Sequence, residues 1–151
     1  VAILGLLIVS IFPTVAFMFQ RLKRTKYDAQ ASLLMQEGIE VAYNVFTANT
    51  DWISLTPGTY KIVRTGPNQL WNLEAGTENI FQTRFTRVIT VSKVCRDSSS
   101  NLISPDLPSL PVLTCSSGAE DTNSRLVTTL VSWDEPGAKP INAQLLVTKF
   151  N

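Results

Sequence analysis

The side chains that most often perform chemistry in proteins are sparse in this chain of 151 residues, which contains no histidine. Histidine is the usual general base near neutral pH and the commonest metal ligand. Its absence excludes serine–histidine–aspartate catalysis, cysteine–histidine catalysis and histidine-based metal sites within one chain. The glycine motifs that bind phosphates or dinucleotides are also missing. The composition therefore predicts a protein that is not an enzyme and needs no cofactor or metal.

The chain has two cysteines, Cys95 and Cys115, and two thiols alone cannot hold a structural zinc ion in a monomer. A disulfide between them would close a loop of about 20 residues and, by removing entropy from the unfolded chain, stabilise the fold by roughly 3 kcal/mol. We favour this disulfide because the intervening segment shows little regular structure and the N-terminal segment indicates export. Two buried free thiols in a reducing compartment are the alternative.

Two acidic residues, Glu37 and Glu40, lie three positions apart in a predicted helix and could form a carboxylate pair. The simpler interpretation is an ion-pair face, either solvated or in contact with a neighbouring copy of the chain. Its partners would be the basic cluster that follows the apolar N-terminal segment: Arg21, Lys23, Arg24 and Lys26.

A second basic group lies along one predicted strand region and could bind DNA phosphates. Its members are Arg84, Arg87, Lys93 and Arg96. Cations are common on sheet surfaces, and the net charge of only +1 gives no overall attraction to nucleic acid. DNA is therefore the less favoured partner.

Residues 1–26 are predicted to be an apolar helix half, since residues 1–19 carry no charge. About 20 helical residues span the roughly 30 Å of a bilayer's hydrocarbon core. Pro13 is expected to kink or locally melt this helix. We expect lipid first, and other copies later, to cover the segment; a plain membrane anchor is the alternative. The expected contact residues are Val1, Leu4, Gly5, Leu6, Ile8, Val9, Phe12, Pro13 and Phe17.

Residues 27–50 continue the predicted helix with an apolar stripe on one side only. Leu34, Gly38, Val41 and Val45 are spaced by four, three and four positions, and Ala42 widens the stripe. This half must dock on a partner surface, which we expect to be the globular part of the same chain. Residues 49–51 are expected to end the helix.

Residues 51–151 change to the two-residue period of strands, at 60–64, 69–73, 85–95, 125–133 and 141–148. Short turns between them predict an antiparallel meander. Within the loop bounded by residues 95 and 115, residues 97–111 are rich in serine and proline and predict a surface loop without regular structure. Trp52, Trp71 and Trp133 are expected in the core between sheet and helix, a carbohydrate-binding platform being the alternative.

Several stretches resemble type IV pilins and pseudopilins, the pilin-like proteins of candidate-phylum bacteria in particular. They are the apolar helix interrupted by Pro13, the run 36–40 (QEGIE), the stretch 85–91 (FTRVITV) and the late run 131–133 (VSW). The helix is the specific part of the resemblance, and the strands are generic. The family usually has glutamate at the fifth mature position, where this sequence has Gly5. That departure fits a sequence whose first few mature residues are missing.

The resemblance implies an α+β fold with a long N-terminal helix packed on a C-terminal antiparallel β-sheet. It implies anchoring in the inner membrane before assembly, leader removal by a prepilin peptidase and polymerisation by a pilus assembly machinery. The expected product is a homopolymeric filament at the cell surface, used for attachment, twitching or surface contact. The alternatives are a minor pseudopilin of a secretion or DNA-uptake system, or a binding domain on a single-pass anchor.

Overall fold

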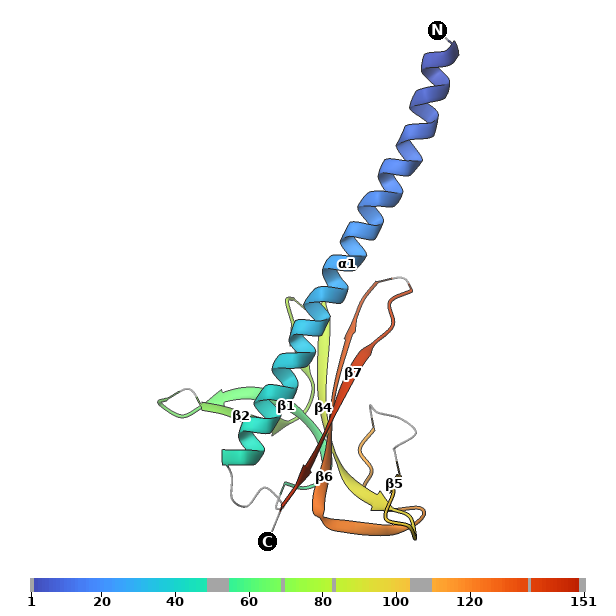
Figure 1. The fold of residues 1–151 in the computed structure, drawn as a ribbon. Helices are drawn as coiled ribbons and strands as arrows, with labels where there is room; N and C mark the ends of the chain where they lie inside the picture. Colours follow the sequence, from blue (N-terminus) through green and yellow to red (C-terminus); the bar gives the residue numbers. More distant parts are fainter. Residues whose placement is uncertain are drawn as a thin grey trace. The chain divides into compact units, whose positions relative to one another are not determined.

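The computed structural model describes residues 2–48, 55–68, 70–82, 84–103, 110–135 and 137–149, with side chains from residue 15 onward (Figure 1). The chain divides into two compact units, Val1–Gln30 and Ala31–Asn151. The first unit is helical. The second contains the end of the same helix and an antiparallel sheet, which confirms the predicted α+β class.

Helix α1 runs over Ala2–Ala48 and matches the single long helix predicted from the sequence. The stop expected at residues 49–51 lies outside the described residues. The backbone stays helical through Pro13, so the helix is not locally melted there, and the alternative expectation of a kink stays a prediction. Proline removes one hydrogen bond from the ladder, but its fixed φ suits a helix, and the many turns on either side propagate cooperatively.

The sheet has the order β2-β1-β4-β6-β7, and β3 and β5 both pair with β4. The strands are β1 (Gly58–Thr65), β2 (Leu70–Ala75), β3 (Glu78–Ile80), β4 (Phe85–Arg96), β5 (Leu102–Ile103), β6 (Ala119–Trp133) and β7 (Ile141–Thr148). The five predicted strands are confirmed, and β3 and β5 were missed because two or three residues carry no readable period. The meander is wrong at one point, since β1 rather than β2 lies beside β4.

The core lies between one face of the sheet and residues 31–48 of α1, which we call the docked half (Figure 1). The predicted helical stripe is confirmed, because Val41, Ala42 and Phe46 are buried against the sheet. Ile89 of β4 and Val127 of β6 are also fully buried there. The three- and four-residue spacing of the stripe therefore places the docked half on the sheet.

The opposite face of the sheet is also buried where β4 pairs with β6. Thr90 and Ser92 of β4 lie opposite Thr128 and Leu126 of β6, and all four are buried. The segment before Cys115 runs along β4: Ser92 Oγ accepts a hydrogen bond from Val112 N at 3.0 Å, and Lys93 N donates to the Val112 carbonyl at 2.9 Å. This segment therefore covers a part of β4 that β5 does not reach.

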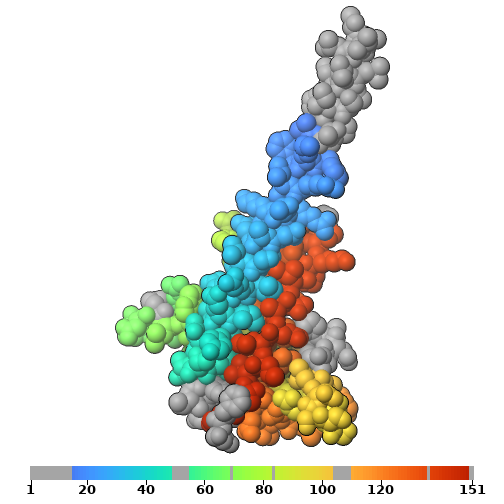
Figure 2. All heavy atoms as spheres, in the orientation of Figure 1, coloured from blue at the N-terminus to red at the C-terminus, as the bar shows by residue number. Residues whose placement is uncertain are grey.

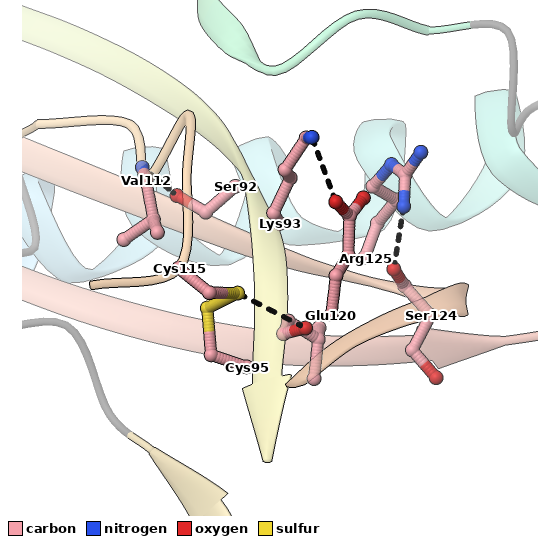
Figure 3. The surroundings of a disulfide bond; sticks show 9 residues. Ser92, Lys93, Cys95, Val112, Cys115, Glu120, Ser124 and Arg125 are labelled. Carbon is pink, nitrogen blue, oxygen red and sulfur yellow. Dashed lines mark hydrogen bonds and ion pairs between the residues drawn. A yellow bond between two sulfur atoms is a disulfide. The ribbon is translucent and has the colours of Figure 1, made fainter. Parts of the chain in front are cut away.

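The predicted disulfide joins Cys95 to Cys115, with 5.7 Å between their Cα atoms (Figure 3). The region between the cysteines is not entirely irregular, because Leu102 and Ile103 pair with the end of β4 as strand β5. Residues 104–109, with two of the three prolines that argued against regular structure, lie outside the described residues.

The expectation that the tryptophans fill the core is wrong for Trp71, which is 37% exposed. It shares a sheet face with buried Leu73, but it lies farther along the β1–β2 hairpin, where the guanidinium carbon of Arg64 stands 4.0 Å from its ring centroid. Trp133 is half-buried beside Phe85, with 6.2 Å between ring centroids. Trp52 lies outside the described residues.

Candidate functional site

The first half of α1, residues 15–30, exposes several large apolar side chains. Their exposed fractions are 42% for Val15, 54% for Phe17, 60% for Met18, 67% for Phe19 and 67% for Leu22. At 100° per residue, Val15, Met18, Phe19 and Leu22 lie within one sector about 100° wide, and Phe17 lies on the opposite side of the helix. Apolar surface gathered in this way marks an interaction site. The first half is therefore the leading candidate for a functional surface.

The remaining predicted contact residues precede Val15. Val1 lies outside the described residues, and Leu4, Gly5, Leu6, Ile8, Val9, Phe12 and Pro13 have a helical backbone with side chains outside the described part. Among the residues that were described, no helix holds a stretch apolar enough to span a bilayer.

The basic cluster stands on the same part of α1, and its members Arg21, Lys23, Arg24 and Lys26 are all exposed. Two of them lie over aromatic rings four residues away. The Arg21 guanidinium carbon is 4.6 Å from the Phe17 ring centroid, and Lys23 Nζ is 5.9 Å from that of Tyr27. Such cation–π contacts keep the charge in water while its stem shields apolar surface.

The structure separates the two predicted acidic residues. Glu37 Oε2 is 2.8 Å from Arg87 Nη1, so this carboxylate has a cation within its own chain. The expectation that Glu37 pairs with the basic cluster of a neighbouring copy stays a prediction, since 43% of its side chain is exposed. Glu40 is exposed, and its Oε1 accepts a hydrogen bond from Gln36 Nε2 at 2.8 Å. Its pairing with the basic cluster of another copy stays a prediction.

Arg87 is the centre of a buried ion cluster, with 3% of its side chain exposed. Its Nη1 donates to Glu37 Oε2 and, at 3.0 Å, to the carbonyl oxygen of Leu34. Its Nε and Nη2 donate to Glu78 Oε2 at 2.9 and 2.7 Å. Burying a guanidinium is costly unless its donors are satisfied, and these four bonds compensate for lost hydration. Arg87 therefore fastens the docked half of α1 to β4 and β3.

The other members of the predicted DNA-binding group are also engaged within the chain. Lys93 Nζ lies 2.8 Å from Glu120 Oε2 (Figure 3), and Arg96 Nε lies 2.8 Å from Asp121 Oδ2. The hydrogen bond from Arg96 is the main reason that the pKa of Asp121 lies below its ordinary value. Arg84 is exposed just before β4 and has contacts of its own. Local ion pairs thus offset the positive charge of Arg87, Lys93 and Arg96, which gives no support to a DNA-binding strand.

Gly38, in the run that resembles pilins, lies where the docked half approaches the sheet most tightly. A Cβ atom at this position would stand 2.5 Å from Cγ2 of Thr129 on β6 and 3.4 Å from Cδ of Arg87. The sequence indicated that residue 38 belongs to the apolar stripe. It carried no signal for the partner strand, because that pairing joins residues 91 positions apart along the chain.

No protein-family model matches the chain, and comparisons with curated proteins and with solved structures found no match either. The arrangement of residues along α1 is consequently the feature from which a function can be inferred.

Proposed function

We propose that this protein is a structural subunit of an extracellular filament of the type IV pilus kind, built by packing the first halves of α1 from many copies. The observation that carries the proposal is the dense apolar surface at Val15, Phe17, Met18, Phe19 and Leu22, each at least 42% exposed. Burying such a side chain contributes roughly 1.5–3 kcal/mol, so five of them represent a large drive toward association.

The two halves of α1 have different surroundings, and this difference supports association between copies. Its docked half is already bound to its own sheet through Val41, Phe46 and the Arg87 cluster. The apolar side chains of the first half are exposed. Apolar helix surface that its own chain leaves exposed needs a surrounding of lipid or of other helices. Lipid would surround this part of the helix before assembly, and helices of other copies would surround it afterwards.

The second unit suits an extracellular position. A disulfide closes the loop between Cys95 and Cys115, and such bonds persist in oxidising compartments. The second unit can fold around its own core, so it needs no partner domain when it is attached to a filament. Under this proposal the chain is held in the inner membrane, processed by a prepilin peptidase and polymerised by a pilus assembly machinery.

The deciding experiment is electron microscopy of fibres sheared from cells that express the full chain, with mass spectrometry of the purified subunit. Uniform helical fibres made of this chain are expected. Replacing Phe17 or Phe19 with Asp should abolish the fibres while the disulfide and sheet remain intact by circular dichroism. Leu102→Asp, which changes an exposed leucine of β5, is the matched control and should leave the fibres unchanged.

Other outcomes would identify the alternatives. Trace amounts of the chain within fibres made of another protein would indicate a minor pseudopilin. A chain that stays monomeric in detergent and forms no fibres would overturn the proposal and favour an anchored binding domain.

A further inference from the structure

Exposed residues recur along α1 at alternating intervals of four and three positions. They are Val15, Phe19, Leu22, Lys26, Ala29, Leu33, Gln36, Glu40, Tyr43 and Thr47, and every one is exposed. We call this set the outer seam. Within the docked half it lies opposite the buried stripe of Val41, Ala42 and Phe46, and Figure 2 shows the docked half open to solvent on the side facing the viewer.

A seam with this spacing is the pattern by which two helices pack as a coiled coil. Large apolar side chains occupy half of it: Val15, Phe19 and Leu22 in the first half of α1, and Leu33 and Tyr43 in the docked half, which are 67% and 52% exposed. Burial of the opposite face against the sheet leaves the seam as the face of the docked half that can receive another helix.

The seam contains two charged residues of opposite sign, Lys26 and Glu40, at equivalent heptad positions two heptads apart. Gln36 donates a hydrogen bond to Glu40 at 2.8 Å, which uses one carboxylate oxygen and holds the side chain along the seam. Charged or polar residues at such positions fix the register of coiled coils, because a mismatched charge would be buried without a partner.

We propose that the outer seam is a contact between two copies of this chain whose α1 helices run parallel with an offset of two heptads. Lys26 of one copy then meets Glu40 of the next, and Phe19 meets Leu33. The offset corresponds to about 21 Å along the helix at 1.5 Å per residue. This inference rests on the proposed filament and names the surface that each subunit offers to a neighbour.

The charges on the seam favour the two-heptad offset over copies in register and over an offset of one heptad. Copies in register would bring Lys26 against Lys26 and Glu40 against Glu40, and like charges at a helix contact are unfavourable. An offset of one heptad would place Lys26 against Leu33, leaving a charge against apolar surface. The two-heptad offset pairs the opposite charges and brings one pair of large apolar residues, Phe19 and Leu33, together.

The offset also explains why assembly would continue beyond two copies. Each copy uses the first half of its seam toward one neighbour and the docked half toward another. Such a contact joins two different surfaces, so it does not close on itself as a two-fold dimer does, and repetition generates an open helical array.

A charge exchange tests the contact. Lys26→Glu and Glu40→Lys, each alone in the full chain, should raise the concentration needed for fibre assembly by at least about tenfold, since like charges then meet across the seam. The double variant Lys26→Glu/Glu40→Lys should restore assembly. Glu74→Lys, an exposed charge change on β2, is the matched control and should assemble normally. Failure of the double variant to recover, or normal assembly of both single variants, would overturn the proposed register.

Cysteine crosslinking tests the register directly. Fibres of the variant Lys26→Cys/Glu40→Cys should give a ladder of disulfide-linked oligomers on mild oxidation, because the two sites lie within bonding distance across the seam. Fibres of Lys26→Cys alone should give none, and dimers from this variant would show copies in register. Intact fibres without crosslinks overturn the seam contact alone. An unsubstituted chain that forms no fibres would overturn the proposed filament itself.

Discussion

Gly38 of α1 and Thr129 of β6 stand so close that a methyl group on Gly38 would lie 2.5 Å from Thr129 Cγ2. No real Cβ atom tolerates that separation, so the absence of a side chain at residue 38 sets how near the docked half lies to the sheet. The same approach brings the Leu34 carbonyl and Glu37 within reach of Arg87.

Gly38→Ala should destabilise the protein even though alanine favours helix by about 0.8–1.0 kcal/mol. Overpacking costs about 1–3 kcal/mol, so we expect a net loss of free energy of unfolding, measured by urea denaturation. Thr129→Ser removes the Cγ2 atom, and the double variant should recover part of the loss. Additive effects of the two substitutions would show that the two residues do not constrain each other.

Arg87→Lys should lower the free energy of unfolding by about 1–3 kcal/mol, because a single ammonium nitrogen cannot reproduce the four hydrogen bonds that the three guanidinium nitrogens donate. Amide hydrogen exchange in the first turns of the docked half should accelerate most. Lys61→Gln, which breaks the exposed pair with Glu74, is the control and should change stability by less than about 1 kcal/mol. Equal losses in the two variants would contradict the fastening role of Arg87.

Cys95→Ser should lower the stability of the domain by roughly 3 kcal/mol, since the unfolded chain regains the entropy of the open loop. Thermal unfolding followed by circular dichroism measures the effect. Reduction of the unsubstituted protein should reproduce it, and reductant should leave the variant unchanged. A variant as stable as the unsubstituted protein would show that the bond does not constrain the loop.

Acid should weaken the end of the sheet around Asp121. Its pKa is lowered chiefly by the hydrogen bond from Arg96, with help from Ser124 and Asn123. A carboxyl whose folded pKa is depressed contributes stability above its unfolded pKa and loses it as pH falls through the folded value. The free energy of unfolding should therefore decrease below about pH 4. Asp121→Asn should flatten this decrease, and an unchanged pH profile in that variant would contradict the assignment.

Local patterns were enough to predict the helix, the buried stripe of its docked half, five strands and the disulfide. Each depends on a short period or on the two cysteines present, and neighbours along the chain carry that information. The seam of exposed residues on α1 is likewise periodic and was present in the sequence. Burial was needed to identify it, because the docked half has two faces and only the sheet decides which of them is covered.

Tertiary structure alone decided the roles of Arg87, Gly38 and Glu37. In the sequence, Arg87 looked like one of several strand cations, and Glu37 looked equivalent to Glu40. Packing of the docked half on β4 buries Arg87 against Glu37 and leaves Glu40 in solvent. Contacts between segments 50 or more positions apart depend on which strands become neighbours, and a periodic pattern fixes the faces of an element without fixing its partner.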